Sequence, residues 1–378
     1  MKKKILILYA TYGSGHKTVA NYIKKYFELY SPDIEVKAAD LILYSNSIKG
    51  IIGKKISENL MLHHPILWDL IYRGSDNSIT GSFSESVIVK PFKNKKLAKE
   101  LKTYNPDLVI ATHFYGSDIA NYYNSKKVIN AKIISIVTDY EAHKMWLKNF
   151  DKQRYVVVSS KEEQKELVKE GYEKEKIKPY GIPIFPVVSE SFKKEETLKR
   201  LKLNKNYKTC LIFTGGSNGS TGTLPYIKAI LKEKKDINLI IVCGRNKKAY
   251  TKIKEYITRY DIKNIYTLGF VNNVPELISS ADFVITKPGG IQTTECLYFK
   301  KPMLLIKSSG GQENANIKHF CKKGYSKWFR TPRKLAKFYS KIENNKEFLK
   351  MQQKLEKSDN TKSMKKIHEL VLKTLKEN

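Results

Sequence analysis

Residues 13–18, "GSGHKT", place a histidine between glycines and a hydroxyl residue directly after an apolar run. A phosphate-binding P-loop would have a lysine in the place of His16, and its first glycine would stand where this chain has Ala10. If a helix begins near His16 and runs to about residue 30, its positive N-terminal end favours the neutral imidazole that a general base needs. The alternative is a glycine-rich turn with an incidental histidine.

A second polar cluster, "TDYEAHKMW" at residues 138–146, follows the apolar run "KIISIV". Asp139 and His143 are four residues apart, so on a helical turn they share a face. Together with Glu141 they are a poor metal set, because one histidine and two carboxylates in a single turn do not match the usual ligand spacing. An acid–base or substrate-orienting pair and a solvated helix start remain the two interpretations.

Glycine loops in the second half of the chain indicate a phosphate site. Pro288, Gly289 and Gly290 follow the apolar run "DFVIT" and precede a predicted helix from Gln292, where backbone N–H groups can approach a diphosphate. Glu295, one turn into that helix, could accept hydrogen bonds from ribose hydroxyls.

Two further loops follow other apolar runs of the same half. "GGQENAN" offers Gln312, Glu313 and Asn316, a polar set suited to sugar hydroxyls, and "TGGSN" at residues 214–218 adds another glycine pair. Three such loops after strands of one sheet predict a nucleotide-sugar site more strongly than one glycine pair does.

The elements that must position these residues are short apolar strands alternating with charge-rich helices over residues 1–180 and 205–330. This alternation predicts an α/β fold with parallel, buried strands. A proline-containing linker lies between the two stretches, and a lysine-rich helical tail follows them. The expected strands are "KILILYA", "IEVKAA", "DLVIATH", "KIISIVT", "RYVVVSS", "TCLIFTG", "NLIIVCG", "IYTLGF", "DFVITK" and "PMLLIK". Two doubly wound domains would face each other across a cleft.

The net charge of +33 has three interpretations: nucleic acid, an anionic membrane surface, or compositional drift. All but seven of the 70 basic residues are lysine, whereas specific nucleic-acid readers favour arginine, so no nucleic-acid partner is expected. The four widely spaced cysteines indicate a reducing cytoplasm. No apolar run is long enough to cross a bilayer, so any membrane contact is expected to be peripheral.

Taken together, these motifs resemble the monogalactosyldiacylglycerol synthase and processive diacylglycerol glucosyltransferase family, inverting GT-B enzymes related more distantly to MurG. Several motifs in the same order carry the resemblance, and one departure is Gln292, where relatives commonly have threonine. The carriers are "GSGH" at 13–16, "PILWDLIY" at 65–72, "TDYEAHKMW" at 138–146, "GIPI" at 181–184, "VCGRN" at 242–246, "LGFVNNVPELISSADFVITKPGG" at 268–290 and G-Q-E-x-x-N at 311–316.

The resemblance implies a GT-B fold with two Rossmann-like domains, the acceptor and membrane domain at residues 1–181 and the UDP-sugar domain at 182–355. A helix at 356–378 could pack back on the first domain. His16 and Asp139 would be catalytic, and Gly15, His143 and Trp146 would bind the acceptor. The expected donor-binding residues are Gly215, Gly216, Arg245, Phe270, Val271, Pro288, Gly289, Gly290, Gln292, Thr293, Glu295, Gln312, Glu313 and Asn316. In this scheme Phe270 lies by the uracil, the glycines by the diphosphate, Glu295 by the ribose, and Gln312 and Glu313 by the hexose.

The implied reaction moves a hexose, with glucose favoured and galactose possible, from a UDP-hexose to diacylglycerol with inversion, and leaves repeated transfer open. No metal or cofactor is required. The implied location is peripheral, on the cytoplasmic face of the cell membrane, in contact with anionic lipids. Residues 41–75 and the basic run at 89–102 have the composition of an interfacial segment. The alternatives are MurG-like transfer of N-acetylglucosamine to a lipid pyrophosphate and a non-catalytic nucleotide-sugar sensor.

Overall fold

The computed structural model describes residues 2–11, 14–44, 93–187, 192–215, 221–233, 236–359 and 361–377. Most of the expected interfacial segment at 41–75, the motif at 65–72 and Gly216 lie outside the described residues. Among the described helices, each is too short or too polar to cross a bilayer.

The chain forms two compact units. The first comprises Met1–Phe185, Ser309–Ala315 and Thr361–Asn378, and the second comprises Pro186–Ser308 and Asn316–Asn360. The boundaries expected from the sequence fell after residues 181 and 355, and the short segment 309–315 was not expected in the first unit.

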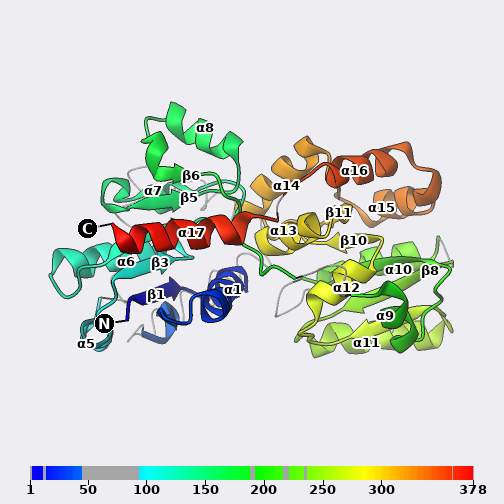
Figure 1. Ribbon diagram of the computed structural model, residues 1–378. Helices are drawn as coiled ribbons and strands as arrows, with labels where there is room; N and C mark the ends of the chain where they lie inside the picture. Colours follow the sequence, from blue (N-terminus) through cyan, green and yellow to red (C-terminus); the bar gives the residue numbers. More distant parts are fainter. Residues whose placement is uncertain are drawn as a thin grey trace. The chain divides into compact units, whose positions relative to one another are not determined.

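The first unit contains a six-stranded parallel sheet with the order β2-β1-β3-β4-β5-β6. Its strands are β1 (Lys4–Tyr9), β2 (Glu35–Asp40), β3 (Leu108–Ala111), β4 (Lys132–Ile136), β5 (Tyr155–Val157) and β6 (Ile177–Lys178) (Figure 1). Apolar residues such as Ile5, Ile7, Val109 and Ile134 are buried because both faces of a parallel sheet are covered. The direction of winding reverses between β1 and β3, so the carboxyl ends of these two strands form a topological switch point.

The helices of the first unit are α1 (Gly15–Tyr30), α5 (Lys95–Tyr104), α6 (Phe114–Ser125), α7 (Lys144–Leu147), α8 (Lys161–Lys169) and α17 (Ser363–Lys376). The last of these, α17, bonds to several parts of the unit although it is distant in sequence. His368 Nε2 lies 2.8 Å from Ser31 Oγ, Ser363 Oγ donates to the Gly181 carbonyl at 2.8 Å, and Lys132 Nζ donates to the Thr374 carbonyl at 3.0 Å. The C-terminal helix is therefore part of the first unit.

The second unit contains a parallel sheet in the order β12-β11-β10-β7-β8-β9, the order of a dinucleotide-binding Rossmann fold. Its strands are β7 (Lys208–Phe213), β8 (Ile237–Val242), β9 (Ile265–Leu268), β10 (Phe283–Thr286), β11 (Met303–Ile306) and β12 (Ser326–Phe329). The described helices around it are α9 (Lys194–Arg200), α10 (Leu224–Leu231), α11 (Lys247–Arg259), α12 (Val274–Ser280), α13 (Gly290–Tyr298), α15 (Pro332–Tyr339) and α16 (Lys346–Glu356), and α14 (Gln312–Lys323) begins in the segment assigned to the first unit. The switch point of this sheet lies between β7 and β10, and the two sheets confirm the predicted α/β class.

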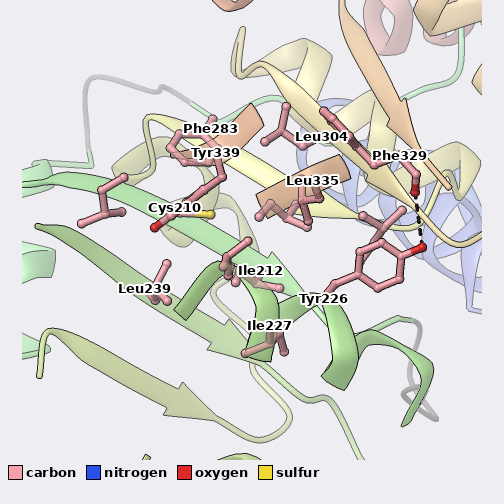
Figure 2. Packing of buried hydrophobic residues seen from close by; sticks show 14 of the residues in the cluster. Cys210, Ile212, Tyr226, Ile227, Leu239, Phe283, Leu304, Phe329, Leu335 and Tyr339 are labelled. Carbon is pink, nitrogen blue, oxygen red and sulfur yellow. Dashed lines mark hydrogen bonds between the residues drawn. The ribbon is translucent and has the colours of Figure 1, made fainter. Parts of the chain in front are cut away.

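The core of the second unit joins the sheet to α10, α15 and α16. Figure 2 shows the packing of residues from α10 and α15 against the strands. Aromatic rings from the helices pack on the strands: Phe348 meets Phe283 edge-on with ring centroids 5.6 Å apart. The Tyr226 hydroxyl, on α10, donates to the Phe329 carbonyl at 3.3 Å (Figure 2) and to the Arg330 carbonyl at 2.9 Å. This bond ties α10 to the end of β12.

We expect Tyr226→Phe to lower the free energy of unfolding of the second unit by about 1 kcal/mol, the usual net value of one buried hydrogen bond. Because the ring is retained, no cavity forms. Urea unfolding followed by tryptophan fluorescence measures the change, and Tyr256→Phe on α11 serves as the control. Equal midpoints for both variants would show that this bond contributes nothing.

Candidate active site

His16 lies at the switch point of the first sheet. The chain leaves β1 at Tyr9 and enters α1 at Gly15, so His16 is the second residue of the helix, as the sequence predicted. Thr112 follows the neighbouring strand β3, whose carboxyl end meets that of β1. The sheet order therefore brings the loops after β1 and β3 together, and the candidate base stands between them.

The hydrogen bonds of His16 determine its tautomer. Nδ1 lies 2.8 Å from the Thr112 carbonyl oxygen and 2.9 Å from Thr138 Oγ1. A carbonyl oxygen can only accept a hydrogen bond, so Nδ1 carries the ring proton. The proton on Nδ1 leaves Nε2 with its lone pair, as a general base requires. In return, Thr112 Oγ1 donates to the His16 carbonyl at 3.0 Å, which fixes the helix start against β3.

The surroundings of His16 favour the neutral imidazole. Burial lowers the pKa of His16 to about 4, and the hydrogen bond to the Thr112 carbonyl opposes that shift in part. The ring of His113 packs edge-on against it, with centroids 4.5 Å apart. Burial, and secondarily the proximity of His16, hold the pKa of His113 well below its usual value. Both imidazoles are therefore neutral near pH 7.

His113 has a local structural role as well. Its Nδ1 accepts a hydrogen bond from the Tyr115 backbone N–H at 3.2 Å, so it caps the start of α6. His113, Thr112 and Thr138 all contact His16. We did not expect these three contacts from the sequence. The sequence did contain a signal for Thr112 and His113. Both are polar residues at the end of the strand-like run "DLVIATH", and polar residues that follow a strand next to β1 lie at the switch point.

The loop after β4 contributes Thr138 to this site, and Asp139 is the next residue, with a half-buried side chain. His143 is buried, and its Nδ1 accepts from the Met145 backbone N–H at 3.2 Å at the start of α7. Trp146 is also buried and packs near the rings of His113 and Phe114, at 6.5 and 6.0 Å. The structure thus brings Thr138 directly to His16, whereas His143 caps α7 and Trp146 packs near the ring of His113. Within the described residues, no three His, Cys, Asp or Glu side chains form a metal-ligand group.

In the second unit, the predicted phosphate loop lies at the switch point between β7 and β10. Gly289 is the N-cap of α13, and its carbonyl and that of Gly290 accept from Thr293 Oγ1 at 2.9 and 3.0 Å. Asn316 Nδ2 donates to the Pro288 carbonyl at 2.9 Å. The side chains of Thr293 and Asn316 therefore hold the loop in place, while its backbone N–H groups stand at the positive end of α13.

Other predicted donor residues surround the same sheet edge. Gly215 follows β7 with φ of 109°, a conformation that favours glycine. Glu295 is buried on α13, and Gln292 Nε2 lies 3.4 Å from its Oε2. After β8 and β9, the Arg245 guanidinium lies 4.7 Å above the ring of Phe270, which is 54% exposed, and Val271 follows it.

Gln312 and Glu313 begin α14 within the segment assigned to the first unit. Glu313 Oε2 accepts from the Ser309 backbone N–H at 2.5 Å, so this carboxylate stabilises the turn before the helix. Its expected contact with a hexose stays a prediction.

Comparison with known proteins agrees with this geometry. Residues 16–184 match the family description "Monogalactosyldiacylglycerol (MGDG) synthase", and residues 210–371 match "Glycosyltransferase family 28 C-terminal domain". A processive diacylglycerol beta-glucosyltransferase from Bacillus pumilus is 30% identical over 84% of this chain and 81% of its own length. The chain belongs to this glycosyltransferase family. The protein of the same name from Staphylococcus epidermidis is 29% identical over 92% of this chain and 87% of that protein.

Solved structures at lower identity show the fold. MurG from Acinetobacter baumannii is 14% identical with a TM-score of 0.58, covering 98% of this chain and 99% of that one. UDP-GlcNAc 2-epimerase from Neisseria meningitidis is 16% identical with a TM-score of 0.60, covering 98% and 100%. These neighbours confirm the GT-B class expected for this family member.

The contact between Thr138 and His16 leads to a prediction. Thr138→Val keeps the side-chain shape but removes one of the two oxygens that hold Nδ1–H, so we expect kcat/KM for sugar transfer to fall by about threefold to tenfold. Thr138→Ser keeps the hydroxyl and should retain most of the activity. Equal kcat/KM for the valine and serine variants would mean that the hydroxyl does not orient the imidazole.

Proposed function

We propose that this enzyme transfers a hexose, with glucose favoured, from a UDP-sugar to diacylglycerol with inversion at the anomeric carbon. The observation that carries the proposal is the neutral His16, whose proton is held on Nδ1 by the Thr112 carbonyl. Membership in the diacylglycerol glycosyltransferase family supports the choice of acceptor. The proposal covers both the transfer of a single hexose and the repeated transfer of hexoses to the growing glycolipid.

The reaction is a single displacement. Nε2 of His16 takes the proton of the acceptor hydroxyl as its oxygen forms a bond to the anomeric carbon. The bond between that carbon and the diphosphate oxygen breaks, and its electron pair leaves with UDP. A positioned general base typically contributes 10²–10⁴-fold to the rate. Asp139, which follows Thr138, is proposed to orient the base or hold the acceptor.

The low pKa of His16 is compatible with this role. A base with a pKa of about 4 is unprotonated at pH 7 but accepts a proton weakly. It therefore takes the proton only as the acceptor oxygen bonds to the anomeric carbon, which makes the hydroxyl proton more acidic.

For the donor, we assign the diphosphate to Gly215, Gly216, Pro288, Gly289 and Gly290, with Gln292 and Thr293 beside them on α13. Glu295 would accept from the ribose, and the exposed ring of Phe270, with Val271 and Arg245, would contact the uracil. Gln312, Glu313 and Asn316 would recognise the hexose. Backbone N–H groups and the α13 dipole stabilise the leaving diphosphate, so we propose no metal or cofactor.

For the acceptor, we assign Gly15, His143 and Trp146 to its half of the site. Diacylglycerol lies in a bilayer, so the enzyme would act peripherally, on the cytoplasmic face of the cell membrane. The net charge of +33 would favour contact with anionic lipids. We propose no nucleic-acid partner.

The first test is UDP release from a panel of UDP-sugars, with and without dioleoylglycerol in anionic liposomes. We expect release with UDP-glucose and dioleoylglycerol together, unchanged by EDTA, because the proposed site holds the diphosphate without a metal. Release with UDP-N-acetylglucosamine and a lipid pyrophosphate instead would identify a MurG-like enzyme. Tight UDP binding without release from any acceptor would indicate a sensor.

The second test concerns the base. His16→Ala should lower kcat by about 10²–10⁴-fold while UDP still binds, because the residues assigned to the uracil, ribose and diphosphate lie on the second unit. His319→Ala, on α14, is the control and should keep normal kcat. In the wild-type enzyme, kcat/KM should stay level as the pH falls toward 5 and decline around pH 4, where free His16 becomes protonated. A near-normal kcat for His16→Ala would contradict the assignment.

A further inference from the structure

Lys307 crosses the carboxyl edge of the second sheet. It follows β11 directly, with φ of 45°, and its side chain reaches Gly222 in the short 3-10 helix after β7. A Cβ atom placed on Gly222 would lie 1.8 Å from Lys307 Nζ and 2.7 Å from Cε, so the ammonium group rests directly against the glycine backbone. Because β10 lies between β11 and β7, the lysine spans the switch point of this sheet.

Other positive groups lie at the same edge as Lys307. Gly222 lies just before α10 (Leu224–Leu231), and α13 begins at Gly290 after β10, so two helix N-termini with partial positive charge lie at the edge that Lys307 crosses. Among the described residues, no carboxylate forms an ion pair with Lys307. A negatively charged ligand at this edge would be attracted by the ammonium group and by both helix N-termini.

A buried hydroxyl at the same edge gives independent support for ligand binding there. Thr214 follows β7 directly and is fully buried, and its Oγ1 has no hydrogen-bond partner within the described part of the chain. Buried hydroxyl groups are nearly always hydrogen-bonded, so a ligand oxygen at this edge would give this atom the partner that the described residues do not supply.

We propose that Lys307 is the counter-charge for the diphosphate of the bound nucleotide sugar and for the UDP that leaves. This inference rests on the proposed function for the identity of the nucleotide. The ammonium would bond to a phosphate oxygen and offset the negative charge that develops when the glycosidic bond breaks, a role for which other enzymes use a divalent cation. The absence of a side chain at Gly222 is what allows the ammonium to reach this edge.

The direct test compares UDP and uridine binding by titration calorimetry. Lys307→Gln should weaken UDP binding by about 10- to 100-fold, the range for a lost charge-assisted hydrogen bond, and leave uridine binding unchanged. Lys307→Arg should retain most of the UDP affinity. Lys300→Gln is the matched control, because Lys300 also has a positive φ, of 55°, and stands near the other end of β11, where it pairs with Glu356.

A second test moves the ammonium without removing it. Gly222 does not require a left-handed conformation, so Gly222→Ala should fold and push away the flexible end of Lys307. We expect UDP affinity to fall in this variant, and we expect no further loss when the change is added to Lys307→Gln, because the two residues act through one group. Thermal unfolding of each variant checks that the fold is intact.

The outcomes separate the two proposals. Equal UDP affinity in the wild type and Lys307→Gln would overturn the role of Lys307 and leave the transferase proposal standing. Parallel losses for UDP and uridine would also overturn it, since they would indicate a general disturbance of the site. A wild-type protein that binds neither UDP nor UDP-sugars would overturn both proposals.

Discussion

The hydrogen bond from His16 Nδ1 to the Thr112 carbonyl is the interaction on which the first unit's chemistry depends. It exists because β1 and β3 are neighbours at a point where the winding of the sheet reverses, which places the loops after both strands side by side. A carbonyl accepts without carrying a charge, so it fixes the tautomer of the imidazole but does little to raise its pKa. A carboxylate in the same place would give a stronger base that is partly protonated before the substrate arrives. The observed arrangement keeps the base neutral.

Much of this architecture follows from the sequence. The apolar runs predicted ten strands, because a strand buried on both faces has few polar residues. They missed β6, which has only two residues, and β12, "SKWF", whose lysine interrupts the run. The helix from residue 15 to 30 and the glycine loop before α13 were also predicted, since turn glycines next to apolar runs are local signals. Our expectation of a simple linear division placed residues 309–315 in the second domain, whereas the structure groups them with the first unit. No local feature of the sequence indicates a grouping of this kind.

The site was less predictable than the fold. A spacing of four residues predicted that Asp139 and His143 share a face, but it gave no sign of the contact between His16 and Thr138, the residue before Asp139. Sequence spacing describes which residues share a face of one element, whereas this contact joins elements more than a hundred residues apart. His113 escaped notice for a similar reason: it looked like the end of a strand, and only the strand order shows that it lies against His16.

The large number of lysines, and the net charge that results from it, is by itself weak evidence for function. Several lysines lie over aromatic rings of the first unit, such as Lys96 over Tyr44 and Lys93 over Tyr122, where the ring face and surrounding water accommodate the charge. Lys307 differs because its ammonium approaches a glycine backbone before a helix N-terminus, where neither a ring nor a carboxylate of the described residues offsets it. A lysine that arose by compositional drift would be expected to extend into solvent. The geometry of this individual contact, rather than the total charge, therefore argues for function.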